Sequence, residues 1–275
     1  MLGRALGREF PEAVPFDRAA VDITDASALR TALAPGIRLV LNAAADTRVD
    51  AAETDPNHVR VNVVAVGTLA ALCRRLDAKL VHVSTDYVFS GKGIRPYRED
   101  DPVDPVNAYG RAKLMGERRA FEEGQEVLVV RTSWLFGAGG VNFVDTILKK
   151  VESGGREISV VDDQIGRPTF VADLAGSIRR LVERNVTGVV HFANAGEVTW
   201  HELASEAIAR EGHAHVKVRA VPSSEFPRPA RRPRWSVLDT SLYERLTGVA
   251  PRSWREGLGE YLADRRTAST ARQAP

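Results

Sequence analysis

The sequence predicts an α/β protein whose main part is a doubly wound parallel sheet, with a smaller α+β lobe beside it. Short apolar runs rich in β-branched residues alternate with longer segments of helical periodicity, which is the pattern of parallel strands joined by crossover helices. After residue 194 the pattern changes to helices with one short apolar run. A chain of 275 residues can form one large domain or two lobes that share an interface.

The predicted elements follow from these two periodicities. The strands of the sheet are predicted at residues 13–16, 37–45, 78–85, 126–134 and 188–194. Helices are predicted near residues 25–33, 57–76, 107–123, 141–153 and 171–184. In the second lobe, Thr199 and Glu202 form a capping-box pattern that starts a helix, and residues 215–221 are expected to be a strand. The first ten residues have the spacing of a helix that ordinarily follows a buried strand and a glycine-rich turn.

The composition is that of an ordinary globular protein, with 44% hydrophobic residues, 27% charged residues and a formal net charge of +2. No apolar segment is long enough to span a bilayer, and the charge is too small to indicate a nucleic-acid partner. The single cysteine, Cys73, excludes a disulfide within the chain. A cytoplasmic location is therefore expected, since arginine and glutamate also interrupt any signal-peptide core near the start.

The clearest chemical signal is the pair Tyr109 and Lys113. Residues four apart on a helix project from the same face, so the phenol and the ammonium can share one small volume. A positive charge near a phenol favours the phenolate, so we expect Lys113 to lower the pKa of Tyr109 and make it a usable acid or base. The alternative is a solvent-facing pair without chemistry, because this spacing alone is common.

Polar or small side chains follow the strands predicted at 78–85 and 37–45, at the edge of a parallel sheet where ligands bind. The first strand end carries Ser84, Thr85, Asp86 and Tyr87. Hydroxyls at this position can hold a carbonyl oxygen while Tyr109 delivers its proton, although strand-end capping is the alternative. The small residues at 42–46 allow close approach of an extended ligand, or serve as packing spacers.

Six motifs occur in a fixed order along the chain: STDYVFSG, NAYGRAKLMGE, RTSWLFG, VNFVDTIL, DDQIGRPT and RPRWSVLDTS. Over about residues 1–262 they resemble the dTDP-4-dehydrorhamnose reductase family, a branch of the extended short-chain dehydrogenases/reductases. The resemblance implies a Rossmann-type dinucleotide-binding domain over residues 1–137 and 170–195. It also implies a substrate-binding lobe over 138–169 and 196–265, followed by a polar tail at 266–275.

The resemblance implies an oxidoreductase that reduces the C4 keto group of dTDP-4-dehydro-β-L-rhamnose, or of a related 4-keto-6-deoxy sugar nucleotide. Thr85 matches the hydroxyl that binds the C4 oxygen, Tyr109 the group that protonates it, and Lys113 the group that tunes the tyrosine and holds the nicotinamide ribose. The matches to substrate contacts are Thr85, Asp86, Tyr87, Trp134, Asn142, Phe143, Arg167, Arg231, Arg232 and Ser236. Guanidinium groups at 231 and 232 suit bidentate pairing with a diphosphate, although a solvated loop is the alternative.

The matches to cofactor contacts lie near the start of the chain and at the end of the strand predicted at 37–45. They are Leu2, Gly3, Arg18, Asp22, Ile23, Asn42, Ala43, Ala44 and Ala45, together with Tyr109 and Lys113. Arg18 follows Asp17, and because a basic group suits a 2′-phosphate, NADPH is expected ahead of NADH. The alternative for this segment is that Thr24 or Asp25 simply caps the next helix.

The chain departs from the family at its beginning, where the family has a strand followed by a G-x-x-G-x-x-G turn. Gly3 matches the last of these glycines, and the sequence lacks the strand and the first two glycines. These parts would occupy the centre of the sheet and approach the pyrophosphate, so the sheet is expected to be unstable without them. An assigned start placed too late is the expected explanation, and a natural truncation that binds cofactor poorly is the alternative.

Two other functions stay open. A non-catalytic binding or regulatory homologue is favoured by the missing turn and opposed by the retained Tyr109 and Lys113. A nucleotide-sugar epimerase or dehydratase is opposed by the DDQIGRPT and RPRWSVLD segments. The expected partner is a small-molecule sugar nucleotide, without nucleic acid or membrane, and the resemblance allows a homodimer and a Mg²⁺ ion at a subunit contact. His213 and His215 are expected to be a solvated pair, so no metal site is predicted from the residues.

Overall fold

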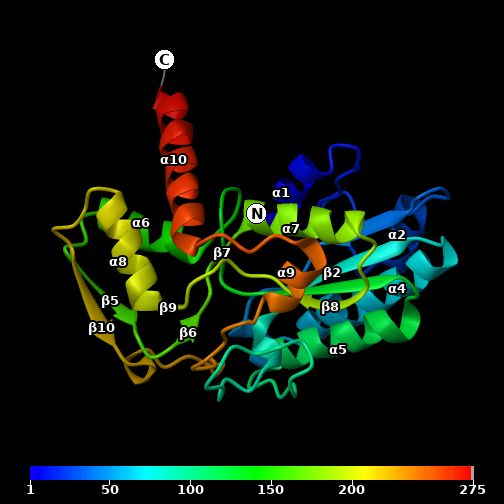
Figure 1. Ribbon diagram of the computed structural model, residues 1–275, viewed down its shortest axis with the longest axis horizontal. Helices are drawn as coiled ribbons and strands as arrows, with labels where there is room; N and C mark the ends of the chain where they lie inside the picture. The colour runs from blue at the N-terminus through cyan, green and yellow to red at the C-terminus, as the bar shows by residue number, and fades with distance from the viewer. Residues whose placement is uncertain (274–275) are drawn as a thin grey trace.

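Four parallel strands form the central sheet, in the order β1-β2-β3-β8, in the computed structural model, which describes residues 1–273 (Figure 1). The strands are β1 (Leu39–Asn42), β2 (Lys79–Thr85), β3 (Val127–Thr132) and β8 (Gly188–His191). The helices that accompany the sheet are α1 (Leu2–Glu9), α2 (Ala26–Ala32), α3 (Asn57–Val59), α4 (Ala65–Arg75), α5 (Ala108–Glu123), α7 (Val171–Glu183) and α9 (Ser241–Thr247). Short 3₁₀ turns lie at η1 (Ala51–Glu53) and η3 (Asp86–Val88), and a π-helical turn at η2 (Arg60–Val64) joins α3 to α4.

Both faces of this sheet are buried, which explains its nearly continuous apolar strands. Leu128 and Val130 on β3 belong to the apolar cluster that contains residues of α1 and α7. Val127 and Val129, the alternate residues of the same strand, pack with residues of α4 and α5. The alternation places helices on opposite faces, as Figure 1 shows for α7 and α5, and the doubly wound prediction is therefore confirmed.

The remaining elements gather at one side of the sheet (Figure 1). They are β4 (Leu135–Phe136), α6 (Phe143–Glu152), β5 (Glu157–Val161), β6 (Ile165–Gly166), β7 (Thr169–Phe170), β9 (Val198–Thr199), α8 (Trp200–Arg210), β10 (Lys217–Val221), η4 (Ser223–Glu225) and α10 (Trp254–Gln273). β5 pairs with β10 in parallel, β4 with β7 in parallel, and β6 with β9 antiparallel. The capping box predicted at Thr199 and Glu202 begins α8, with both of its hydrogen bonds formed.

One predicted strand is wrong. Residues 13–16 form no strand and are exposed: Val14 is 73% and Phe16 51% accessible. Pro15 has no backbone N–H to donate, and no described strand pairs with this segment or with the outer edge of β1. The polar tail predicted at 266–275 is helical as far as Gln273, within α10, and residues 274–275 lie outside the described part of the chain.

Two glycines bring α5 close to the rest of the site. A Cβ on Gly110 would lie 2.2 Å from the carbonyl oxygen of Tyr87, and one on Gly116 would lie 2.1 Å from that of Asn62. At the start of the helix, Asn107 accepts a hydrogen bond from the Gly110 N–H at 2.8 Å and donates to the Arg231 carbonyl at 2.8 Å. α5 is thus fixed against η3, η2 and the 228–236 segment at close range.

Candidate active site

Helix α5 presents three polar residues to the sheet along one face: Tyr109, Lys113 and Glu117. They are four residues apart, so they lie one turn above another on the buried side of the helix. All three are buried, with 8%, 1% and 3% of their surface accessible. The predicted pair is therefore not a solvent-facing one, and it lies beside the carboxyl end of β2.

The environment of Tyr109 differs from the sequence-based expectation in one respect. Burial raises the pKa of its phenol, the nearby Asp86 carboxyl adds to the rise, and the Thr85 hydroxyl opposes it. The expectation that Lys113 lowers this pKa is wrong for this structure, because the ammonium group is turned toward the sheet, where it donates to the Val83 carbonyl at 2.7 Å. A phenol with a raised pKa stays protonated at neutral pH but is a weaker acid, so Tyr109 carries the proton here without a nearby cation that would help the proton leave.

Lys113 has a second buried partner that the sequence analysis missed. Its Nζ lies 3.1 Å from Nε2 of His82, a fully buried ring on β2 whose Nδ1 lies 3.1 Å from the Asn42 amide nitrogen. Burial lowers the pKa of Lys113 to about 8, and burial together with Lys113 lowers the pKa of His82 well below its usual range. Alternate residues of a strand point to the same face of the sheet. Because His82 lies two residues before Ser84, this spacing could have predicted that both side chains face α5.

Thr85 and Asp86 form a hydrogen-bonded pair at the carboxyl end of β2. The Thr85 hydroxyl donates to Oδ1 of Asp86 at 2.9 Å and accepts from the Tyr87 N–H at 3.2 Å. Ser236, from the segment 228–236, has its hydroxyl beside the same carboxyl. Asp86 is 2% accessible, and burial raises its pKa to about 7 against the opposing effect of these hydroxyls. Its Oδ2 is buried and makes no hydrogen bond to any described residue.

Arg231 and Arg232, the two arginines expected to bind a diphosphate, differ in whether the guanidinium is already held by another side chain. Arg232 pairs with both carboxylate oxygens of Asp50, including an Nη2 to Oδ2 distance of 3.0 Å, and its guanidinium also faces the Tyr87 hydroxyl. Arg231 is exposed, and its backbone carbonyl is held by Asn107. Arg231 is therefore free to move toward a ligand, whereas Arg232 must leave or share Asp50 to bind a second anion.

Trp134 lies in a separate aromatic cluster. It has a left-handed backbone with φ of 47°, which is strained for a bulky residue, and its ring stacks on Trp200 with centroids 3.5 Å apart. Phe143 also contacts Trp200, at 4.5 Å between centroids, and the missing side chain of Gly166 leaves room for the Trp134 ring. The sequence did not predict that Trp200 belongs to this cluster. Locally it is only the residue that follows the helix cap Thr199.

Asn142 and Arg167 already have structural partners. The Asn142 side chain caps α6 by accepting from the Asp145 N–H at 3.0 Å, and it donates to the Gly137 carbonyl at 3.1 Å. Arg167 lies 3.6 Å from a Glu197 carboxylate oxygen, and its Nε is buried without a hydrogen bond to a described residue. The structure thus gives Asn142 a capping role, while Arg167 keeps one unused donor.

The predicted cofactor residues outside α5 form three groups, of which two are the end of β1 and the surface segment that contains Arg18 and Asp22. Asn42 is the last residue of β1, and Ala43, Ala44 and Ala45 follow it beside the end of β2, with Ala44 exposed. At the surface, Arg18 lies 3.7 Å from Asp22, and Asp22 accepts two hydrogen bonds from Thr24 that lower the pKa of its carboxyl. Ile23 is partly buried beside Leu29, and Asp25, rather than Thr24, caps α2.

Leu2 and Gly3 lie in the first turn of α1. Leu2 is buried in the main core, and Gly3 is exposed with no atom within 4 Å of an added Cβ. The helix has no side-chain cap at its N-terminus. With the alanines after β1 and the exposed Arg18, this open surface suits the backbone contacts and the phosphate charge of a dinucleotide.

Behind the site lies a buried ion pair that the sequence analysis also missed. Arg131 on β3 donates to both carboxylate oxygens of Glu117, at 2.7 Å from Nη2 to Oε2 and 3.0 Å from Nε to Oε1. The Ser84 hydroxyl donates to the same carboxylate, and the guanidinium lies over the Phe89 ring. The spacing of Glu117, four residues after Lys113, is the sequence signal that could have placed it on the same helix face.

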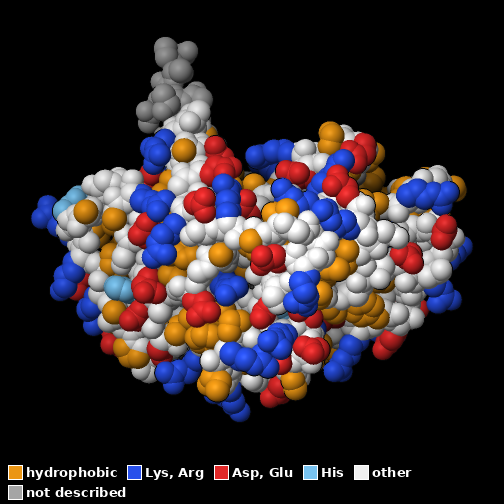
Figure 2. Space-filling model, viewed as in Figure 1, with side chains coloured by type: hydrophobic (Ala, Val, Ile, Leu, Met, Phe, Trp, Pro, Cys, Tyr) orange, Lys and Arg blue, Asp and Glu red, His pale blue; other side chains and the backbone are white. Residues whose placement is uncertain are grey.

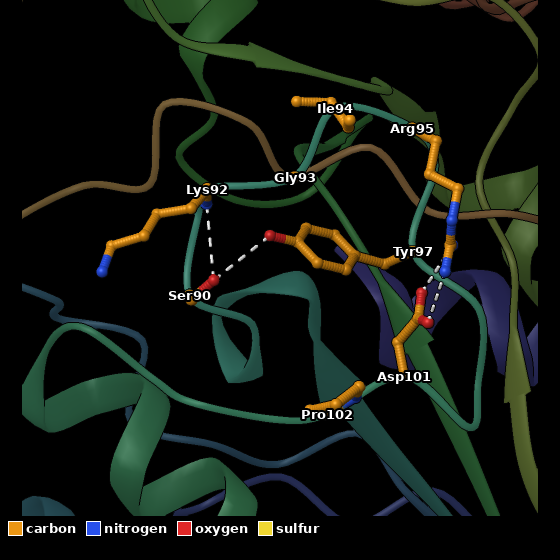
Figure 3. A pocket seen from close by; sticks show the side chains of 8 residues that line it. All are labelled: Ser90, Lys92, Gly93, Ile94, Arg95, Tyr97, Asp101 and Pro102. Atoms are coloured by element: carbon orange, nitrogen blue, oxygen red, sulfur yellow. Dashed lines mark hydrogen bonds and ion pairs between the residues drawn. The ribbon is translucent and has the colours of Figure 1, made fainter.

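A cavity of about 290 Å³ lies outside the predicted site, under the loop after η3 (Figure 3). It is lined by Ser90, Lys92, Gly93, Ile94, Arg95, Tyr97, Asp101 and Pro102. In Figure 3 the Tyr97 ring crosses its centre, with its hydroxyl 3.4 Å from the Ser90 hydroxyl, while Arg95 and Asp101 pair at one end. The internal pairing of its polar groups leaves little for a ligand to bind.

The surface seen in Figure 2 has acidic and basic side chains intermixed, without a region of a single sign. Among residues 1–273, no helix has both the length and the apolar composition needed to cross a membrane. Within the same residues, no three His, Cys, Asp or Glu side chains are grouped so that they could hold a metal ion.

Comparisons with known proteins give one consistent result. A family model described as the RmlD substrate binding domain matches residues 1–267. A dTDP-4-dehydrorhamnose reductase from Streptomyces griseus is 42% identical, over 94% of this chain and 89% of that protein. The crystal structure of a dTDP-4-dehydrorhamnose reductase from Clostridium acetobutylicum superposes with a TM-score of 0.90 at 34% identity, covering 96% of both chains. That of the enzyme from Bacillus anthracis in complex with NADP superposes with a TM-score of 0.87 at 34% identity, over 94% of this chain and 95% of that one.

Proposed function

Because this chain belongs to the dTDP-4-dehydrorhamnose reductase family, we propose that it reduces the C4 keto group of dTDP-4-dehydro-β-L-rhamnose, or of a related 4-keto-6-deoxy sugar nucleotide. The observation that carries the proposal is the buried juxtaposition of Tyr109, Lys113 and Thr85 at the carboxyl end of β2. Burial of a lysine ammonium group costs free energy, and a regulatory homologue without catalysis would gain nothing from such a lysine at this position.

Each side chain has a role in this reaction that its surroundings support. Tyr109 donates its proton to the C4 oxygen, since burial keeps the phenol protonated. Thr85 binds the same oxygen, and Asp86, Tyr87 and Ser236 surround the sugar. Arg231 is an exposed cation that can bind the diphosphate, and Trp134 with Phe143 forms an aromatic wall of the substrate lobe.

NADPH, or NADH, supplies the hydride when bound. Arg18 would face a 2′-phosphate, Asp22 and Ile23 the adenosine, and Asn42 to Ala45 with Leu2 and Gly3 the pyrophosphate and ribose. Lys113 would leave the Val83 carbonyl to reach the nicotinamide ribose, a movement that the flexible lysine stem allows. A neutral His82 remains behind it as an acceptor.

The boundaries of the two lobes, a cytoplasmic location and a homodimer are further parts of this proposal. The free, buried thiol of Cys73 is compatible with a reducing compartment. Size-exclusion chromatography with light scattering measures the assembly directly.

The test is turnover of NADPH with the keto sugar nucleotide by the wild type and two tyrosine variants. Tyr109→Phe removes the proton donor, and we expect kcat to fall by about 10²–10⁴-fold while the fold is kept. Tyr97→Phe is the matched control, because the Tyr97 hydroxyl lies in the outer cavity, with its hydrogen bond to Ser90, and kcat should be unchanged. A wild type that binds both ligands without turnover would instead support the non-catalytic homologue.

A further inference from the structure

The direction of one hydrogen bond at the site conflicts with the role proposed for Thr85. The Thr85 oxygen lies 2.9 Å from Oδ1 of Asp86, and an ionised carboxylate can only accept, so an ionised Asp86 would take the single proton of the Thr85 hydroxyl. The Thr85 oxygen also accepts from the Tyr87 N–H. In this arrangement Thr85 has no proton to offer to the C4 oxygen of a sugar, so it cannot stabilise the negative charge that develops there during reduction.

A neutral Asp86 removes this conflict. A protonated carboxyl can donate to the Thr85 oxygen along the same 2.9 Å line, which turns the Thr85 proton away from the carboxyl. The burial of Asp86 favours this neutral form, since an ionised carboxylate without a cation is costly in such a place. Its buried Oδ2, which lacks a hydrogen bond among the described residues, is another sign that the site is not built for a full negative charge.

The groups around Asp86 include no cation paired to it. Tyr87 on the same turn and Tyr109 on α5 face Asp86. Arg232 faces Tyr87, Asp46 faces Tyr109, and Lys113 lies one helical turn after Tyr109. The basic groups among them are engaged elsewhere: Arg232 with Asp50, and Lys113 with the Val83 carbonyl. Burial is accordingly the largest effect on Asp86, and it raises the pKa of this carboxyl to about 7.

We propose that Asp86 is a positioning residue for the reduction: in its neutral form it donates a hydrogen bond to Thr85 and thereby aims the Thr85 hydroxyl proton at the C4 oxygen. The inference rests on the proposed function, and it assigns Asp86 a task beyond contact with the sugar. Asp86 keeps its own proton throughout. The proton that the product gains comes from Tyr109, and Thr85 only stabilises the oxygen while the charge develops.

The pH dependence follows from the geometry with a definite sign. Below the pKa of Asp86 the carboxyl is neutral and Thr85 is correctly directed. Above it the carboxylate captures the Thr85 proton, so kcat should fall as pH rises through about 7. The decrease should approach about tenfold for each further pH unit, as expected for the loss of one essential protonated form.

The decisive variant is Asp86→Asn. Its amide Nδ2 can donate to Thr85 at every pH, and its amide oxygen can accept from the Ser236 hydroxyl, so it imitates the neutral acid permanently. We expect Asp86→Asn to lose the decrease above neutrality, so that the ratio of kcat near pH 6 to kcat near pH 9 falls from about 100 in the wild type to roughly 1 in the variant. Asp86→Ala has no donor, and its kcat should be lower by about 10²-fold at every pH. Asp264→Asn, an exposed substitution on α10, is the matched control and should retain the wild-type profile.

The measurement is kcat and KM from about pH 5.5 to about pH 9 with NADPH and the keto sugar nucleotide, with circular dichroism of each variant to verify folding. If the kcat of Asp86→Asn still decreased above neutral pH as in the wild type, the proposal would be overturned, because the titrating group would then be another residue. A raised KM with an unaltered kcat profile would also overturn it and leave Asp86 as a sugar-hydroxyl ligand only. Absence of wild-type turnover would refute the proposed function itself, which is a different result from either of these.

Discussion

At the scale of single residues, the buried pair Arg131 and Glu117 links three elements behind the active site. Both side chains are at most 5% accessible and share three charge-assisted hydrogen bonds. Glu117 also accepts from Ser84, the neighbour of Thr85 on β2. Because α5 carries Glu117 and Lys113 on one face, this pair holds the catalytic face of the helix in register with the sheet.

Removing one partner of this pair should cost far more than removing a surface pair. Arg131→Met leaves the Glu117 carboxylate buried without a cation, and we expect the free energy of unfolding to fall by about 3–5 kcal/mol. The control is Arg119→Ala, whose guanidinium pairs with Glu122 and Glu123 at the surface and should contribute less than about 1 kcal/mol. Urea unfolding curves of both variants give the comparison, and equal losses would contradict the assignment.

At the scale of elements, the position of α5 depends on residues that lack a side chain. The Gly116 Cα faces the Asn62 carbonyl in the π-helical turn η2, where an added Cβ would lie 2.1 Å from the oxygen. Such a distance forces backbone displacement, since neither partner is a flexible side-chain end. Close helix approach at this point therefore sets where Tyr109 and Lys113 meet β2.

Gly116→Ala should consequently reduce both stability and activity. We expect a loss of about 1–3 kcal/mol in the free energy of unfolding, together with a decrease in kcat as α5 moves from β2. Gly7→Ala is the matched glycine-to-alanine control: Gly7 lies in α1, is exposed, and has no atom within 4 Å of an added Cβ. It should stabilise the protein by about 0.5–1 kcal/mol. Chemical unfolding and NADPH turnover measured on the same samples separate the two effects.

At the scale of the whole molecule, the cofactor surface is assembled from separate parts of the chain. The start of α1, the surface pair Arg18 and Asp22, and the alanines after β1 all belong to the first 45 residues of the chain. The main core joins α1 to β3, α7 and α8, so stability and cofactor binding are coupled through one apolar cluster. A ligand that binds only the folded state should therefore raise the apparent stability.

A titration of NADPH into the protein, followed by its fluorescence, should saturate. At about 100 times the Kd, the cofactor should add about 2.7 kcal/mol to the free energy of unfolding. Arg18→Ala should weaken NADPH binding about 10-fold or more and leave NADH binding unchanged, because only the former has a 2′-phosphate. Arg8→Ala, an exposed arginine in the last turn of α1, serves as the control. Equal weakening of both cofactors would place the 2′-phosphate elsewhere.

Local patterns in the sequence were sufficient for most elements of the sheet domain. The apolar runs that became β1, β2, β3 and β8 were predicted within a few residues, because strands buried on both faces must be apolar throughout. The strand expected at 13–16 failed, since an apolar run becomes a strand only if a neighbour is present to pair with it. β5 was missed, because its five residues gain their stability from β10, more than fifty positions away.

The chemistry available to this protein can be read from local sequence, because the spacing of Tyr109 and Lys113 on one helix face and the hydroxyls at a strand end are local properties. The tertiary structure alone decided the protonation states and partners of these groups. Burial raises the pKa of Tyr109 and Asp86 and lowers that of Lys113, and burial is a property of the packed molecule. The contacts that orient the site, such as that of Ser236 with Asp86, join residues that only the fold brings together.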